Sequence, residues 1–489
     1  MSQRVQKHRH QQRREPPPSG QRPRSNLVPR DIKALAEALT AFHTCFHDLF
    51  VRREQREWSA LYLRGQLSDL ERKTVEPMVL ALKGADPAAV RAVQQFLGQG
   101  LWDDDPILWR LQRLIAEELG ADDGVVVIDG SSFPKQGRHS VGVARQYCGH
   151  LGKVANCQHA VFAAYSSAKG HAFLDRRLYM PEGWFNDTHA PRRIRAGVPE
   201  RVTFKTEPQL GLAIVQGLVE RGRLPFQWVL ADETYGADPK FLDGVDALGR
   251  WYFVEVPVTT RVWSGPITVE PAGKGAMGRP RKYARAVEGT PKPREVRQMA
   301  QALPATAWRR YTIQEGAKGR IEAECACLRI TRSKRHGKPG AEAWAVFRRN
   351  LSVGTPVKVF LTNAPASCAK RELARMSGMR WPIETAFQEA KGEVGMDHYE
   401  VRTWRGWHHH MTQTFLAHYF LVHMRVRGEK SRADHSAGQA TARSHTFQTN
   451  DHARTRHRPH PVSASAELRG VPVAPDQNRV KPPQTPDAA

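Results

Sequence analysis

Two short apolar runs that each end in an aspartate constrain the fold of this chain more than any other feature. Residues 125–128 (Val-Val-Val-Ile) precede Asp129, and residues 226–231 (Phe-Gln-Trp-Val-Leu-Ala) precede Asp232. Short apolar runs bounded by turn residues are typical of central strands covered on both faces. A buried carboxylate at a strand end is costly unless a partner neutralises it, and a metal ion is a common partner. The sequence therefore predicts a mixed α/β sheet with acids at its strand ends.

A third acid lies in the stretch 379–391, Met-Arg-Trp-Pro-Ile-Glu-Thr-Ala-Phe-Gln-Glu-Ala-Lys. Pro382 suits the first turn of a helix, and Glu384 and Lys391 then fall on one helical face. Arg380 stands one turn before Glu384. A carboxylate beside two cations stays ionised, which suits metal binding next to a polyanion better than proton donation. Glu389 is a rival third acid, but it lies about 140° round the helix from Glu384.

Three carboxylates in a basic chain predict two-metal phosphoryl transfer. Asp129, Asp232 and Glu384 are the expected catalytic residues and metal ligands, and two Mg²⁺ ions, for which Mn²⁺ can substitute, are the expected cofactors. Two metal ions held by these carboxylates would activate the attacking oxygen and stabilise the leaving oxygen. The candidate phosphate contacts are the cations around these acids: Arg380, Lys391, Lys135, Arg145 and Lys153. For the last three, placement on an ordinary exposed surface is the alternative.

The net charge of +25 over 489 residues favours a nucleic-acid partner. No run of about 18 apolar residues is present, and the N-terminus lacks the apolar core of a signal peptide, so we expect no membrane association. Six cysteines form no disulfide framework, which fits a reducing cytoplasm. Cys148 and Cys157 each precede a histidine by two positions, which is poor spacing for structural zinc. For His408–His410 an exposed helix turn is favoured over a metal site.

The pattern along the chain predicts six regions. They are a disordered basic arm (1–30), a helical and DNA-binding region (31–120), the first part of the catalytic domain (121–258), a β-rich insertion (259–355), the second part of the catalytic domain with the third acid (356–427), and a disordered tail (428–489). The arm holds eight Lys/Arg against one Glu. Because the helical pattern stops abruptly after Arg427, a shifted reading frame is one hypothesis for the tail.

Together these motifs resemble the bacterial DDE transposases of the insertion-sequence 701 family, a family related to the insertion-sequence-4 group. The resemblance covers about 50–427 and rests on Ile-Asp at 128–129 with Ser-Ser-Phe-Pro-Lys-Gln-Gly, on Ala-Asp at 231–232 with Glu-Thr-Tyr-Gly, and on Arg-Trp-Pro-Ile-Glu at 380–384 with Lys391. It implies an RNase H-like catalytic domain with a β-rich insertion, and Mg²⁺-dependent DNA transposition. It also implies that Asp129, Asp232 and Glu384 are the first, second and third acids.

This sequence departs from the family pattern at two positions. The related group's signature has a tyrosine where this chain has Ser377, and relatives often carry an acid where it has Gly130. Some relatives form hairpin intermediates and hold a flipped base against an aromatic residue. Trp263 and Trp344 are candidates for that role, with core packing as the favoured alternative for each.

The predicted function is cleavage at the ends of the element followed by attack of the freed 3′-OH on target DNA. The expected partners are double-stranded DNA, at terminal inverted repeats and at the target, and a second copy of the chain in a homodimer. No small-molecule substrate is expected. The alternative is a degenerate remnant that binds DNA without cutting it. A phosphatase is a weaker option, because that class places Asp-x-Asp after its strand, whereas here Asp129 is followed by Gly130 and Ser131.

Overall fold

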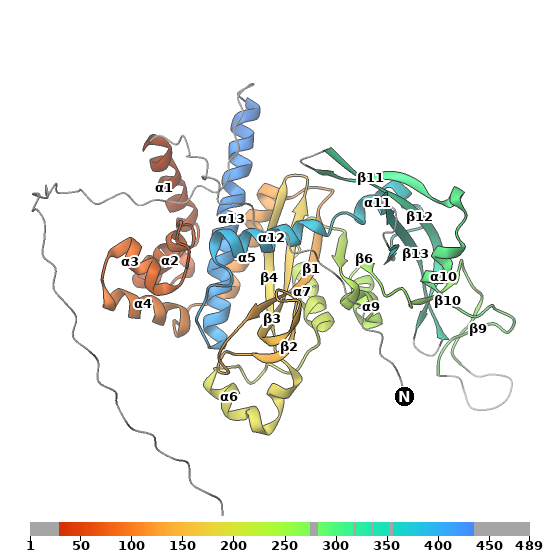
Figure 1. The fold of residues 1–489 in the computed structure, drawn as a ribbon, viewed down its shortest axis with the longest axis horizontal. Coiled ribbons are helices and arrows are strands. Elements are labelled where there is room, and N and C mark those ends of the chain that lie inside the picture. The colour runs from red at the N-terminus through yellow and green to blue at the C-terminus, as the bar shows by residue number, and fades with distance from the viewer. Residues whose placement is uncertain (1–28, 274–281, 317–318, 335–336, 352–355, 435–489) are drawn as a thin grey trace, which may run out of the picture. The chain divides into compact units, whose positions relative to one another are not determined.

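The computed structural model describes residues 29–434, apart from 274–281, 317–318, 335–336 and 352–355. A large mixed sheet carries the fold (Figure 1). Its first strands are β1 (Val125–Pro134), β2 (Ala144–Cys148), β3 (Lys153–Ser167), β4 (Gly170–Tyr179), β5 (Trp228–Ala231) and β6 (Trp251–Glu255). β1, β5 and β6 are parallel neighbours, whereas β3 runs antiparallel to β1, β2 and β4. The predicted mixed α/β class is confirmed.

The course of β1 differs from the prediction in one respect that matters for the site. Its first four residues are fully buried, as expected for a strand covered on both faces. The strand does not end at Asp129 but continues to Pro134, because β3 keeps pairing with it as far as Cys157. Its pairing with β5 stops earlier, at Ile128 opposite Ala231. Asp129 therefore lies at the point where β1 and β5 separate.

The β-rich stretch after residue 259 extends the same sheet. Its strands are β7 (Arg261–Ser264), β10 (Arg294–Glu295), β11 (Arg309–Gly316), β12 (Gly319–Lys334), β13 (Lys338–Asn350) and β14 (Lys358–Thr362). β14 pairs antiparallel with β6, and β13, β12, β7 and β10 follow outward in that order, while β11 forms a hairpin with β12. A separate ribbon joins β8 (Val269–Glu270) to β9 (Arg285–Ala286).

Helices form the N-terminal part and cover the sheet. They are α1 (Pro29–Thr44), α2 (Arg53–Gln66), α3 (Val75–Lys83), α4 (Pro87–Gly98), α5 (Asp104–Leu119), α6 (Ala190–Arg195), α7 (Glu207–Arg221), α8 (Glu233–Gly236), α9 (Pro239–Ala247), α10 (Val296–Ala302), α11 (Lys370–Met376), α12 (Trp381–Val394) and α13 (Trp404–Asp434). In the part of the chain that the structure describes, no helix is long and apolar enough to cross a membrane.

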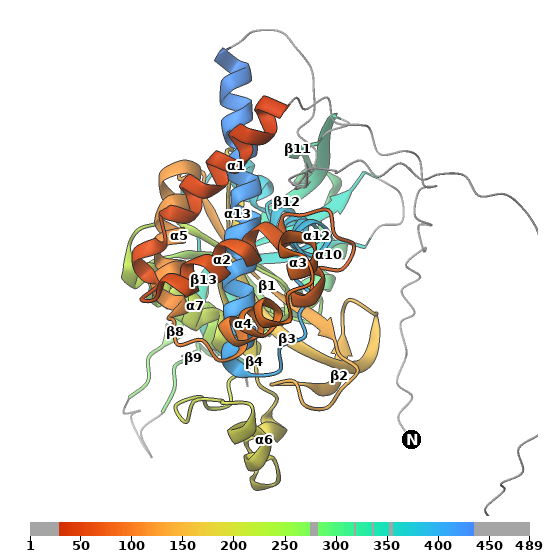
Figure 2. The same cartoon turned by 90° about the vertical axis from the view of Figure 1, so that its left-hand side faces the viewer.

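The long helix α13 joins the N-terminal helices to the sheet. It contacts α2, α4, α5, α12 and β4, and Figure 2 shows it running behind α1 and α2. Buried side-chain hydrogen bonds cross this contact: Gln413 Nε2 donates to Ser59 Oγ (3.0 Å), and Gln66 Nε2 donates to Thr414 Oγ1 (2.8 Å). α13 continues to Asp434, past the predicted boundary at 427. The rest of the predicted tail, like the predicted arm before Pro29, lies outside the described residues.

The prediction that His408–His410 form an exposed turn is wrong. His409 and His410 are almost fully buried, because this turn of α13 faces the N-terminal helices. The His409 ring stacks on Trp102 at 3.6 Å between centroids, and its Nδ1 lies 2.9 Å from the carbonyl oxygen of Leu97. These histidines hold the packing between helices.

Candidate active site

The first two acids are neighbours because of strand register. Asp129 and Asp232 directly follow Ile128 and Ala231, the last residues that pair in the parallel strands β1 and β5. After β5 the chain turns into α8, and Asp232 caps this helix by accepting a hydrogen bond from the Thr234 amide at 2.9 Å. Both carboxylates therefore lie where the pairing of β1 with β5 ends, although only Asp232 also follows the last residue of its strand.

The third acid reaches this edge from α12, which packs on β1, β3 and β4. Ile383, Phe387 and Ala390 face the sheet, so Glu384 lies in the exposed first turn. Arg380, immediately before the helix, bridges two of the acids: it donates to Asp129 Oδ2 at 3.2 Å and to Glu384 Oε1 at 3.0 Å. Residues separated by 251 positions in sequence thus share one ion-pair network.

Asp129 lies near several other charged side chains, and its own side chain is 16% exposed. Burial raises the pKa of Asp129 to about 7, and although Arg380 opposes this shift, the charges of Asp232 and Glu384 add to it. The carboxylates of Asp232 and Glu384 thus make the charged form of Asp129 less favourable, and a bound cation would relieve this repulsion.

Tyr235 belongs to the same site and was missed by sequence reasoning. It follows Asp232 by three positions, and its buried hydroxyl has no hydrogen-bond partner among the described residues. Burial, followed by the charges of Glu207, Asp129 and Asp232, raises the pKa of Tyr235 well above its usual value, so the hydroxyl remains protonated. The Glu-Thr-Tyr-Gly segment was the available signal, since a tyrosine in the first turn after a strand-end acid lies near that acid.

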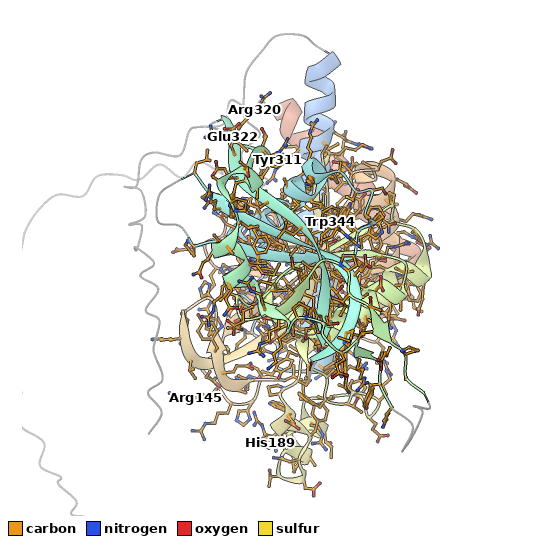
Figure 3. The ribbon with its side chains drawn as sticks, turned by 90° about the vertical axis from the view of Figure 1, so that its right-hand side faces the viewer. Arg145, His189, Tyr311, Arg320, Glu322 and Trp344 are labelled. Carbon is orange, nitrogen blue, oxygen red and sulfur yellow. The ribbon has the colours of Figure 1, made fainter. Side chains whose placement is uncertain are left out.

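The predicted cations take different places. Lys391 lies two turns along α12 from Glu384, with its Nζ 5.3 Å from the Phe133 ring centroid. Lys135 is largely buried and donates to the carbonyl oxygen of Tyr399 at 3.1 Å. Arg145 and Lys153 are exposed on the β2–β3 hairpin, where Figure 3 shows the Arg145 side chain pointing outward. Of the predicted phosphate contacts, the structure brings only Arg380 into contact with the acids.

Two aromatic candidates are core residues. Trp263 and Trp344 are 5% and 6% exposed, and their indole nitrogens donate to the carbonyl oxygens of Pro291 and Pro365. Figure 3 places Trp344 in the middle of the sheet. Trp381 is instead 58% exposed, and it lies between Arg380 and Pro382 at the start of α12. Its position beside the acids makes it the aromatic residue available to a ligand of this site.

The two departures from the family pattern have local explanations. A Cβ atom at Gly130 would lie 2.7 Å from Nε2 of His159, so this position has no room for a side chain while His159 is in place. Ser377 is buried and its hydroxyl donates to the Ala374 carbonyl oxygen at 2.6 Å, within the C-terminal turn of α11. Gly130 contacts the acids through its backbone, since its amide donates to Asp129 Oδ1 at 2.8 Å.

Comparison with known proteins identifies the family of this chain. The family model described as DDE superfamily endonuclease matches residues 41–320, more than half of the chain and a range that includes Asp129 and Asp232. A curated relative from Microchaete diplosiphon, named probable transposase for insertion sequence element IS701, is 30% identical over 194 residues, which is 39% of this chain and 46% of the relative. The chain thus spans about half the length of this relative. On the family match, the chain belongs to the DDE superfamily endonucleases, and it is similar to the transposase of an insertion sequence of the 701 family.

Proposed function

We propose that this protein is a transposase that cuts DNA at the terminal inverted repeats of its own element and joins the freed 3′ ends to target DNA. The observation that carries the proposal is the convergence of Asp129, Asp232 and Glu384, from two parallel strands and one helix, around Arg380. Asp129, Asp232 and Glu384 act as the catalytic metal ligands. A homodimer on double-stranded DNA is part of the same proposal, since strand transfer joins two ends.

The donor chemistry fits Mg²⁺. Three carboxylates supply the oxygen ligands that Mg²⁺ and Mn²⁺ prefer, and the raised pKa of Asp129 marks an unneutralised group of acids. The unpartnered hydroxyl of Tyr235 lies near the same acids and can donate to a bound water. When bound, two Mg²⁺ ions would activate the attacking oxygen and stabilise the leaving one. Arg380 donates hydrogen bonds to oxygens of Asp129 and Glu384 that a metal ion would also use, so it competes with metal for this site.

The residues of the chain itself position the DNA. Arg380 offers a planar guanidinium for a phosphate next to the scissile bond. Lys391 lies about 16 Å from Arg380 along α12, at about 1.5 Å per residue, which corresponds to about five base steps of duplex. α12 therefore offers cations at two positions along a DNA strand. Arg145 and Lys153 extend the basic surface on the β2–β3 hairpin.

We further propose that strands β4, β3, β1, β5 and β6 form an RNase H-like core. The support is the order of these strands and the three parallel members, β1, β5 and β6, that follow β3. The stretch 259–355 then is an insertion that lengthens the sheet beyond β6 and β14. The helices of 31–120 would form the DNA-binding region, with α13 fixing them to the core.

The first test is strand cleavage of a labelled duplex that carries the terminal repeat of the element, with Mg²⁺ or Mn²⁺. Asp232→Asn should abolish cleavage and leave DNA binding intact. Asp238→Asn is a matched control, because Asp238 caps α9 by accepting from the Lys240 amide, just as Asp232 caps α8. Asparagine caps helices as well as aspartate does, so both variants should fold. Cleavage by the Asp232 variant at the wild-type rate would refute the proposal.

The identity of the third acid is tested on the same helix. Glu384→Gln should abolish cleavage, and its control is Glu393→Gln near the end of α12. Glu389, the rival in the sequence, points to His171, His418 and Arg425 instead of the three acids. If Glu384→Gln cleaved DNA normally, the assignment of the third acid would be wrong.

We do not favour a degenerate remnant that only binds DNA. That alternative assumed loss of C-terminal helical structure and exposure of core residues. α13 instead buries its apolar side chains from Trp407 to Val426 against the N-terminal helices and β4. Binding of the terminal repeat without cleavage in either metal would favour the remnant.

A further inference from the structure

A second cluster of metal-capable side chains lies on the opposite side of α12 from Glu384. Among the described residues, one group of three such side chains has ligand atoms that all lie within 4.8 Å of one another: His171, Glu389 and His418. His171 comes from β4, Glu389 from α12 and His418 from α13. We propose that this cluster is a zinc site that clamps the catalytic helix to the sheet and to α13.

The distances fit a tetrahedral ion. Nε2 of His171 and Nε2 of His418 each lie 3.2 Å from the same oxygen, Oε2 of Glu389. With zinc bonds of about 2.0–2.1 Å, neighbouring ligands of a tetrahedron lie about 3.3 Å apart. A charge-assisted hydrogen bond from an imidazolium to a carboxylate is usually shorter, about 2.7–2.9 Å. Two nitrogens and one oxygen, with an open fourth position, form a ligand set that zinc commonly uses.

The donor set separates this site from the three acids. Imidazole nitrogens suit zinc and other late transition metals, whereas Mg²⁺ takes oxygen ligands. The His418 side chain is 1% exposed, whereas those of His171 and Glu389 are 18% and 19% exposed, so the cluster is partly open to solvent.

Arg425 is the residue that opposes a metal. Its Nη1 donates to Oε1 of Glu389 at 2.6 Å and leaves Oε2 to the two histidines. The rival explanation is therefore a metal-free cluster, in which Arg425 and two neutral histidines donate to one carboxylate. The two explanations predict different results when Arg425 is removed. If the cluster binds zinc, loss of the neighbouring positive charge should tighten zinc binding. If the cluster is metal-free, the same change should only destabilise the fold.

The proposed zinc site holds α12 on the side away from Glu384. Glu389 is five positions after Glu384, so a metal on Glu389 fixes the segment of α12 that carries Glu384 and Arg380. Phe387 lies between them and packs on Phe162 and Phe173 of the sheet. The site therefore positions the third acid without taking part in the chemistry, and its occupancy is measured without DNA.

The experiment is zinc binding by the full-length protein. Protein stripped with chelator is titrated with Zn²⁺ against a chromophoric competitor, and bound metal is counted by mass spectrometry. We expect one zinc per chain. His171→Gln and His418→Gln should weaken binding by at least about 100-fold, because a glutamine amide can still donate to Glu389 but is a poor zinc ligand. The control is His423→Gln, since His423 lies on the same helix but contacts Glu118.

Arg425→Met supplies the second discriminating variant. Tighter zinc binding by this variant, together with a higher melting temperature of the wild type in zinc, would support the clamp. The proposal is overturned if the stripped wild type takes up no zinc, or if both glutamine variants bind zinc as the wild type does. Because these measurements need neither DNA nor Mg²⁺, their failure would leave the proposed transposase activity standing.

Discussion

Replacing Asp129 with asparagine should make the metal-free protein more stable at pH 8. Burial raises the pKa of Asp129 to about 7 in the folded state, from an ordinary value of 3.8. A carboxyl group with a raised folded-state pKa binds its proton more tightly when folded, so folding becomes less favourable as the pH rises from about 4 to 7. At 1.36 kcal/mol per pH unit, the full cost above pH 7 is about 4 kcal/mol.

The pH dependence of the gain identifies its cause. Asparagine has a similar shape and no charge, so Asp129→Asn should match the wild type near pH 4, gain stability between pH 4 and 7, and keep a constant gain above that. The figure of about 4 kcal/mol already includes the ion pair with Arg380, because that cation is one of the charges that set the pKa of Asp129. Urea unfolding in the presence of a chelator, at five pH values from 4.5 to 8.5, measures this gain.

Two results bear directly on this reasoning. Mn²⁺ should stabilise the wild type at pH 8 and leave Asp129→Asn nearly unaffected, because the cation supplies the charge that the buried acids lack. A variant that is less stable than the wild type at pH 8, or a gain that is the same at every pH, would show that Asp129 carries no electrostatic cost.

Three further variants test single contacts. Trp381→Ala should weaken DNA binding by about 1–3 kcal/mol if the exposed indole stacks on a base, whereas Tyr283→Ala, an exposed aromatic residue of the stretch 259–355, should not; equal affinities in a gel-shift titration would contradict this. Lys391→Met should lower the slope of log affinity against log salt by about one, as expected for one lost phosphate contact; an unchanged slope would show that Lys391 only packs on Phe133. Phe387→Ala should cost about 3–5 kcal/mol of folding free energy in urea, and Gln388→Ala, on the exposed side of α12, should cost little.

Sequence reasoning located the first two acids because their contact is local to a sheet. Parallel neighbours bring their carboxyl ends together, so two apolar runs that end in aspartate were enough to predict that Asp129 and Asp232 meet. The contact of Glu384 with this edge depends on how α12 packs on β1, β3 and β4, and no pattern within α12 specifies that packing. Glu384 was predicted as the third acid from its spacing with Arg380 and Lys391, and the resemblance to a family implied the same residue.

The wrong prediction for the histidines comes from the burial of polar groups. His409 and His410 were predicted to be exposed, because the sequence does not show the backbone carbonyl oxygens and the indole ring that surround them. For Trp263 and Trp344 the favoured alternative of core packing agrees with the structure, since both pack in the sheet with satisfied indole nitrogens. Trp381 is the better candidate for contact with a ligand because its side chain is exposed. Exposure depends on tertiary packing, so the hydropathy of the sequence could not predict it.

The two faces of α12 explain how one short helix could serve two metals without mixing them. Glu384 and Glu389 have chemically identical side chains, but they point to different sides of α12, so each carboxylate has different neighbours. Glu384 meets Asp129 through Arg380, so its surroundings are oxygens and a guanidinium. Glu389 meets two imidazoles that are held by β4 and α13. Since Mg²⁺ prefers oxygen and zinc prefers nitrogen in such sites, the neighbours of each carboxylate select its ion. A chelator selective for zinc should therefore loosen α12 while leaving the binding of Mn²⁺ to the three acids measurable, and loss of both together would show that the clamp and the acids are one site.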